Sequence, residues 1–206
     1  MRTLRDNALT IAFLLLTGFA VVGQAIAGLK LENAELTSHG DAAVSMAHYL
    51  GSSSFGVDLL ENWQSEFMQF TTFIFVTVWL AQRGSAEGKA AGDEGLEETR
   101  PPGFRGFARA HGLLLVMLTC FIATWAGQYA AGWSAYNAEQ RLHGDPALAF
   151  GAYVTEPEFW SRTLQNWQSE FLAVAAMAVF TVYLRELGSP ESKRLETPNT
   201  DNEPTY

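Results

Sequence analysis

Two glutamates in identical surroundings are the residues of this sequence best suited to chemistry. Glu66 and Glu170 each belong to a copy of the hexapeptide Asn-Trp-Gln-Ser-Glu-Phe, at 62–67 and 166–171. On a helix, the Asn, Ser and Glu of each copy fall on one face. A carboxyl group beside amide and hydroxyl groups can bind a cation, and two neighbouring carboxylates favour the retention of one proton. The pair is therefore a candidate site for a small ion or solute.

Two glutamines extend this site. Gln24 and Gln128 each lie in the pattern Gly-Gln-x-x-Ala-Gly, at 23–28 and 127–132, inside apolar segments. The small residues of this pattern allow helices to approach closely, so that glutamine and glutamate side chains can meet. The predicted site, which we call the polar cluster, comprises Gln24, Asn62, Glu66, Gln128, Asn166 and Glu170.

The polar cluster supports two interpretations. In the first, it binds or moves a small ion or solute near the outer leaflet, because ionisable side chains inside a membrane commonly mark such pathways. In the second, it is a clasp that fixes the register of helices in a structural or partner-binding scaffold. The sequence leaves both open.

A repeated His-Gly-Asp tripeptide gives a third hypothesis, an external metal-binding protein. Its candidate ligands are His39, Asp41, His143 and Asp145, since imidazole and carboxylate groups are common metal ligands. A simpler interpretation is that each aspartate caps a short external helix, because Asp145 precedes Pro146, and proline is favoured at the first position of a helix. No nucleotide-binding loop, nucleophile elbow or haem-attachment sequence occurs, so no catalytic residue and no cofactor is assigned, and a role other than an enzyme is favoured.

These motifs are parts of one duplication. The chain aligns with itself without a gap at an offset of 104 residues, the spacing of Gly23 and Gly127. Further matches pair Asn33 with Asn137, Tyr49 with Tyr153, Thr77 with Thr181 and Gly84 with Gly188. Repeat 1 covers 9–89 and repeat 2 covers 113–193. Each holds two apolar segments, so the repeats should enter a membrane in the same orientation, as parallel repeats.

The apolar segments predict four membrane crossings. A helix needs about 20 residues to span the hydrocarbon core, and 9–29 and 112–133 reach this length. The segments 67–82 and 171–184 are shorter and would take the hexapeptides partly into the membrane. The first segment resembles a secretory signal, but the same Gly-Gln ending recurs mid-chain, which favours a retained helix. We expect an all-α membrane four-helix bundle of two parallel-repeat transmembrane hairpins, with short external interfacial helices, in a single domain over 1–206.

The distribution of charge sets the orientation. Most basic residues fall on one side of this topology, namely Arg2, Arg5, Arg83, Lys89, Arg100, Arg105, Arg109, Arg185, Lys193 and Arg194. The positive-inside rule then places both termini and a linker over 83–110 in the cytoplasm of a bacterium, with the protein in its plasma (inner) membrane. The polar tail over 189–206 is predicted to be disordered.

The net charge and the cysteine content limit the kinds of partner and cross-link that the chain is expected to have. The net charge of -9, without a clustered basic face, argues against binding to nucleic acid. The lipid bilayer is the expected surrounding, and association with a second copy of the chain stays open. The single cysteine, Cys120, lies in an apolar run, so it cannot form an intramolecular disulfide.

The duplicated hexapeptide, the Gly-Gln-x-x-Ala-Gly endings and the Gly-Ser-x-Glu-x-Lys after each second apolar segment resemble a bacterial family of small multi-pass membrane proteins. The resemblance covers nearly the whole chain up to about Arg194. That family is classed as a domain of unknown function. The resemblance therefore implies a four-span membrane protein and supplies no activity.

Overall fold

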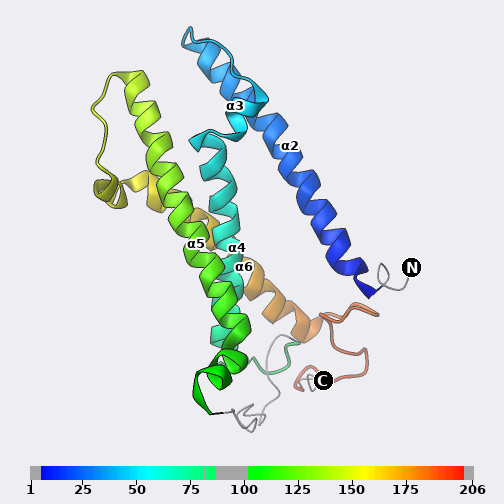
Figure 1. Ribbon diagram of the computed structural model, residues 1–206. Helices are drawn as coiled ribbons and strands as arrows, with labels where there is room; N and C mark the ends of the chain where they lie inside the picture. Colours follow the sequence, from blue (N-terminus) through cyan, green and yellow to red (C-terminus); the bar gives the residue numbers. More distant parts are fainter. Residues whose placement is uncertain (1–5, 81, 87–101, 202–206) are drawn as a thin grey trace. The chain divides into compact units, whose positions relative to one another are not determined.

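The computed structural model describes residues 6–80, 82–86 and 102–201. Its helices are α2 (Ala8–Ser38), α3 (Met46–Leu50), α4 (Ser53–Thr77), α5 (Gly103–His143), the 3-10 helix η1 (Phe150–Thr155) and α6 (Pro157–Tyr183) (Figure 1). The described ranges contain no β-strand. The prediction of an all-helical chain is confirmed.

The chain divides into two compact units. Unit 1 comprises Met1–Leu60 and Gly127–Tyr153, and unit 2 comprises Glu61–Ala126 and Val154–Tyr206. Helices α4 and α5 each contribute residues to both units. All contacts described below lie within one unit.

Two helices, α2 and α5, are long and apolar enough to cross a membrane. Their most apolar windows have mean hydropathies of 2.1 and 1.7 and are almost entirely unburied within the chain. Large apolar side chains such as Leu9 and Phe19 are 73% and 79% exposed. The helices α4, of 25 residues, and α6, of 27 residues, are long enough but contain no window that is equally apolar and poor in charge. The four-crossing arrangement therefore stays a prediction.

Glycines end α2 and α5 in the same way. Gly40 has φ of +87° and Gly144 has φ of +77°, a backbone conformation that strongly favours glycine. The N–H of Asp41 donates to Leu36 O at 2.9 Å, and the N–H of Asp145 donates to Gln140 O at 2.9 Å. In each case the donor lies five residues after the acceptor, and a glycine with positive φ lies just before the donor. This arrangement is the Schellman motif, which commonly ends helices.

The predicted capping role of the two aspartates is therefore wrong. Residues 41–45 and 145–149 are not helical. Ser45 is the N-cap of α3, and its side chain accepts a hydrogen bond from the N–H of His48 at 3.3 Å. Asp41 and Asp145 instead complete the preceding helices through their backbone N–H groups, because the glycine before each aspartate turns the chain.

Two asparagines hold the loops that follow these helix ends. Asn33 Oδ1 accepts from the N–H of Val44 at 2.7 Å, and its Nδ2 donates to Val44 O at 3.1 Å. Asn137 makes the same two bonds with Leu148, at 2.6 Å and 3.0 Å. In each loop the asparagine side chain pairs with both the N–H and the C=O of one residue, so neither backbone group is left without a hydrogen bond. Each loop is thus held against the helix that it leaves.

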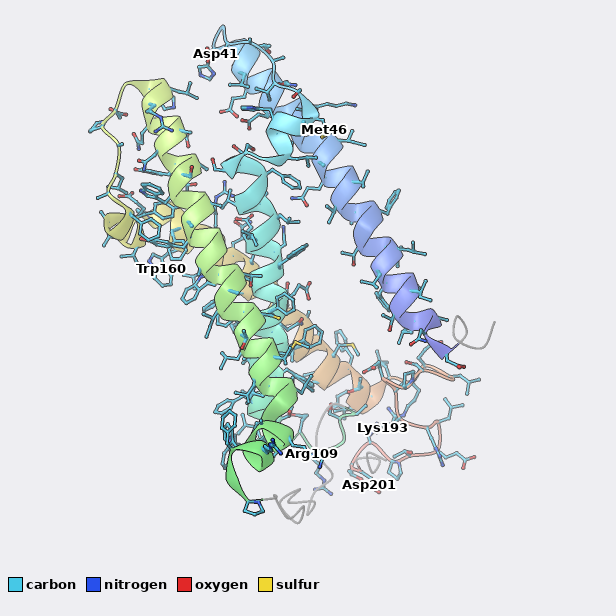
Figure 2. All side chains as sticks on the ribbon, in the orientation of Figure 1. Asp41, Met46, Arg109, Trp160, Lys193 and Asp201 are labelled. Atoms are coloured by element: carbon cyan, nitrogen blue, oxygen red, sulfur yellow. The ribbon has the colours of Figure 1, made fainter. Side chains whose placement is uncertain are left out.

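Two tyrosines pack against glycines of these helices. Tyr49 and Tyr153 are only 2% and 1% exposed. A Cβ at Gly28 would overlap the Tyr49 hydroxyl, and one at Gly132 would lie 2.7 Å from the Tyr153 hydroxyl. The last glycine of each Gly-Gln-x-x-Ala-Gly pattern therefore gives the tyrosine room. In unit 1 the core consists of Ala25, Tyr49 and Phe55, with Met46 (labelled in Figure 2) packed against it.

The predicted linker and tail are only partly described. Helix α5 begins at Gly103, inside the expected linker over 83–110, and residues 87–101 lie outside the described ranges. The tail follows turns as far as Asp201. There the buried Lys193 donates from Nζ to Pro198 O at 3.2 Å and to Asp201 O at 3.1 Å (Figure 2). The disorder expected over 189–206 stays a prediction.

Candidate functional site

The two hexapeptides meet in unit 2, where α4 carries the first copy and α6 carries the second. Trp167 Nε1 donates to Gln64 Oε1 at 2.9 Å. Ser65 Oγ donates to Asn62 O at 2.8 Å and lies 3.5 Å from Glu170 Oε1, and Gln69 Nε2 donates to Glu170 O at 3.4 Å. Polar residues of one copy therefore contact the tryptophan and the glutamate of the other.

Gln64 is the most deeply buried polar residue of this contact. It has no exposed surface, and its Nε2 has no hydrogen-bond partner among the residues that the structure describes. An indole N–H can only donate, so the Gln64 oxygen must face Trp167 and the orientation of the amide is fixed. The Nε1 of Trp125 is also buried without a partner, and its ring lies 5.8 Å from that of Trp167. Buried donors ordinarily have acceptors. Gln64 Nε2 and Trp125 Nε1, both near the indole of Trp167, have none among the described residues.

The two glutamates are placed differently. Glu66 is exposed and Glu170 is half-buried. Asn62 is exposed, whereas Asn166 is half-buried and donates from Nδ2 to Arg162 O at 3.0 Å. The second copy of this Asn and Glu pair is thus buried more than the first.

The remaining members of the polar cluster belong to unit 1. Gln24 lies on α2 and is half-buried, and Gln128 lies on α5 and is 1% exposed. The predicted hydrogen bonds between these glutamines and the glutamates stay a prediction.

A hollow of about 210 Å³ opens beside the contact between the hexapeptides. Gln69, which bonds to Glu170, lies in its wall. The rest of the wall is mostly apolar and includes Phe70, Phe73, Val174 and Met177. The space is large enough for a few water molecules or a small solute.

The histidines of the two His-Gly-Asp tripeptides lie near each other in unit 1. The rings of His39 and His143 are 6.4 Å apart between centroids and nearly perpendicular, at 79°. Both side chains are exposed. Nowhere in the described ranges do three or more His, Cys, Asp or Glu side chains form a group that could hold a metal ion.

Residues 1–204 match a family model described as Domain of unknown function (DUF6766). The chain belongs to this family. No curated protein and no solved structure matches the chain.

In this DUF6766 chain, sequence reasoning missed Gln64, Trp125 and the aromatic packing around them. Unit 2 holds a cluster of rings made by Phe121, Trp125, Phe159, Trp160 (labelled in Figure 2) and Trp167. An ion pair of Arg162 Nη1 with Glu61 Oε2, at 3.1 Å, adds to the same unit. The available signal was the hexapeptide itself, which contains both an obligatory donor, Trp, and a residue that can accept, Gln.

Proposed function

We propose that this DUF6766 protein is an integral protein of the bacterial plasma membrane, with four crossings and cytoplasmic termini. The apolar windows of α2 and α5 are almost entirely unburied within the chain, and water would disfavour so much exposed apolar surface, whereas lipid would not. The helices α4 and α6 then cross by taking the hexapeptides to the outer edge of the hydrocarbon. The excess of basic residues on one side supports the orientation.

We further propose that the crossings form two parallel repeats. Equivalent residues make equivalent bonds in the two halves. The asparagine bonds to Val44 and Leu148, the Schellman bonds after α2 and α5, and the glycine contacts of Tyr49 and Tyr153 all recur. Gly84 and Gly188 likewise share positive φ, at 80° and 84°. This agreement supports a duplication of structure as well as of sequence.

The function that the geometry supports best is the binding or movement of a small ion or solute at the contact between the hexapeptides. The proposal rests on the contact between the copy on α4 and the glutamate of the copy on α6: Ser65 Oγ lies 3.5 Å from Glu170 Oε1, and Gln69 Nε2 donates to Glu170 O at 3.4 Å. Glu66, next to Ser65 in the chain, is the second carboxylate of the proposed site. A pair of carboxylates favours a cation, including a proton. The adjacent hollow gives space for a ligand, and the buried Nε2 of Gln64 offers a donor that has no acceptor within the described ranges.

Flux measurements on purified protein in liposomes test this proposal. With Na⁺, K⁺ and protons as probes, we expect flux of at least one of them above that of empty liposomes. Glu170→Gln and Glu66→Gln should each reduce it about tenfold or more, because each removes a charge from the site. Glu35→Gln, at an exposed position of unit 1, is the matched control and should leave flux unchanged. Flux at the level of empty liposomes for all three probes would end the proposal.

A second function, a structural or partner-binding scaffold, is favoured by the hydrogen bond from Trp167 to Gln64. Under it, the contact between the hexapeptides only joins α4 to α6. Glu66→Gln and Glu170→Gln would then lower the Tm in detergent, while the wild type would show no flux above empty liposomes. The two experiments together therefore separate a transport site from a clasp.

A further inference from the structure

His39 and His143 occupy equivalent places at the ends of α2 and α5. Each precedes the left-handed glycine that ends its helix, and the two rings lie 6.4 Å apart between centroids. Both helix ends carry partial negative charge from their carbonyl groups, which favours a cation nearby. Two neutral imidazoles at such a place are a pair of nitrogen ligands.

The hydrogen bonds of His39 determine which nitrogen is free. Its Nδ1 lies 3.0 Å from Glu35 O and 3.3 Å from the Ser38 hydroxyl. A carbonyl oxygen only accepts, so Nδ1 carries the proton and Nε2 keeps its lone pair when the ring is neutral. Histidines that bind metals commonly donate their other N–H to a carbonyl in this way.

The separation of the rings suits a shared metal ion. With metal–nitrogen bonds of about 2.0–2.1 Å, two imidazoles on one tetrahedral ion have centroids about 5 Å apart. The observed 6.4 Å requires a closure of only about 1 Å between two exposed side chains. Glu139 Oε1, 4.0 Å from His143 Nε2, adds negative charge beside the pair.

We propose that His39 and His143 together bind a divalent transition-metal ion of the class that prefers imidazole, represented by Zn²⁺. Water completes the coordination, since the described residues supply no group of three or more ligands. Such an ion exchanges readily, and it joins the end of α2 to the end of α5 within unit 1. This site is separate from the proposed function at Glu66 and Glu170 and does not depend on it.

Calorimetric titration of metal-free, full-length protein in detergent with Zn²⁺ at about pH 7.5 tests the proposal. We expect one ion per chain and a rise in Tm on binding. His39→Ala and His143→Ala should each weaken binding about tenfold or more and remove the rise in Tm. His48→Ala, an exposed histidine of α3 in the same unit, is the matched control and should bind like the wild type.

Absence of Zn²⁺ binding by the wild type up to about 1 mM would overturn the proposal. So would undiminished binding by His39→Ala and His143→Ala, or an equal loss in His48→Ala, because each would place the ion elsewhere.

Discussion

Asn137 holds Leu148 by both of its backbone polar groups, with Oδ1 accepting at 2.6 Å and Nδ2 donating at 3.0 Å. Asn33 holds Val44 in the same way. In each case the loop returns along the helix that it leaves, and a tyrosine after it packs against a glycine of that helix. In both places the asparagine thus fixes the loop against the helix that precedes it.

Replacing these asparagines should destabilise the protein unequally. Asn137→Ala leaves the N–H of Leu148 without its partner, while Leu148 O keeps the hydrogen bond from Trp133 Nε1 at 2.8 Å. The variant should lower the free energy of unfolding by roughly 1–3 kcal/mol. Asn33→Ala should cost less, because Asn33 is half-buried whereas Asn137 is 4% exposed. Thermal unfolding in detergent measures both. Gln165→Ala, at an exposed position of α6, is the control. If Asn137→Ala lowered the Tm no more than Gln165→Ala does, the hydrogen bonds of Asn137 to Leu148 would not contribute to stability.

The close contact between Gly132 and Tyr153 predicts that Tyr153→Phe offsets part of the stability lost in Gly132→Ala. A Cβ at position 132 would lie 2.7 Å from the tyrosine hydroxyl, and the next ring atom is 3.3 Å away. Gly132→Ala should therefore cost roughly 1–3 kcal/mol of stability. In the double variant with Tyr153→Phe the clash disappears with the hydroxyl, so the combined loss should be smaller than the sum of the single losses.

The equivalent pair in unit 1, Gly28 and Tyr49, supplies an internal comparison. There the tyrosine Cζ would still lie 2.9 Å from the new Cβ, so Tyr49→Phe should rescue Gly28→Ala only in part. Gly23→Ala, with no atom within 4 Å of the added carbon, is the control and should be neutral or slightly stabilising. Additive losses at both pairs would show that the hydroxyl contacts do not limit the packing.

Much of the fold follows from local patterns in the sequence. Apolar windows over 9–29 and 112–133 predicted the helices α2 and α5, because long apolar segments favour helices. The same patterns predict the helix ends wrongly. Asp145 before Pro146 is typical of a helix start, whereas Gly144 ends the preceding helix with a Schellman motif. Both motifs use the same few residues, and only the backbone angle at Gly40 or Gly144 separates them.

The site was predictable in part. The duplication pointed to the two hexapeptides, which contact each other through Gln64 and Trp167 and through Ser65 and Glu170. The pairing of Glu66 with Glu170 stays a prediction. It could not show that Gln64 is buried while its counterpart Gln168 is exposed. Identical sequences differ here because burial depends on the helix packed against each copy, and that is a long-range contact rather than a local preference.

The burial of Tyr49 predicts a pH dependence. Burial, followed by the charges of Asp58 and Glu32, raises the pKa of the Tyr49 hydroxyl above its ordinary value of 10.0. The folded protein thus disfavours the phenolate. Neutral Tyr49 therefore contributes to the free energy of unfolding in full below about pH 10, and this contribution is lost as the pH rises from there through the raised pKa. The Tm in detergent should fall over that range in the wild type, and less steeply in Tyr49→Phe. Tyr183→Phe, at an exposed position, should follow the wild type; identical slopes in all three would exclude this contribution.

The two hexapeptides allow one substitution to be compared at two places in the same chain. Gln64 accepts from Trp167, and no reciprocal hydrogen bond joins Gln168 to Trp63 in the described chain. Gln64→Leu should lower the Tm, because it leaves the indole N–H of Trp167 unpaired, at a cost of roughly 1–3 kcal/mol. Adding Trp167→Phe removes that unpaired donor, so a double-mutant cycle should show coupling between the two positions. Gln168→Leu, in the exposed copy, should change the Tm little. Equal effects of Gln64→Leu and Gln168→Leu would mean that the two copies are equivalent in the protein, contrary to the asymmetric contact between α4 and α6.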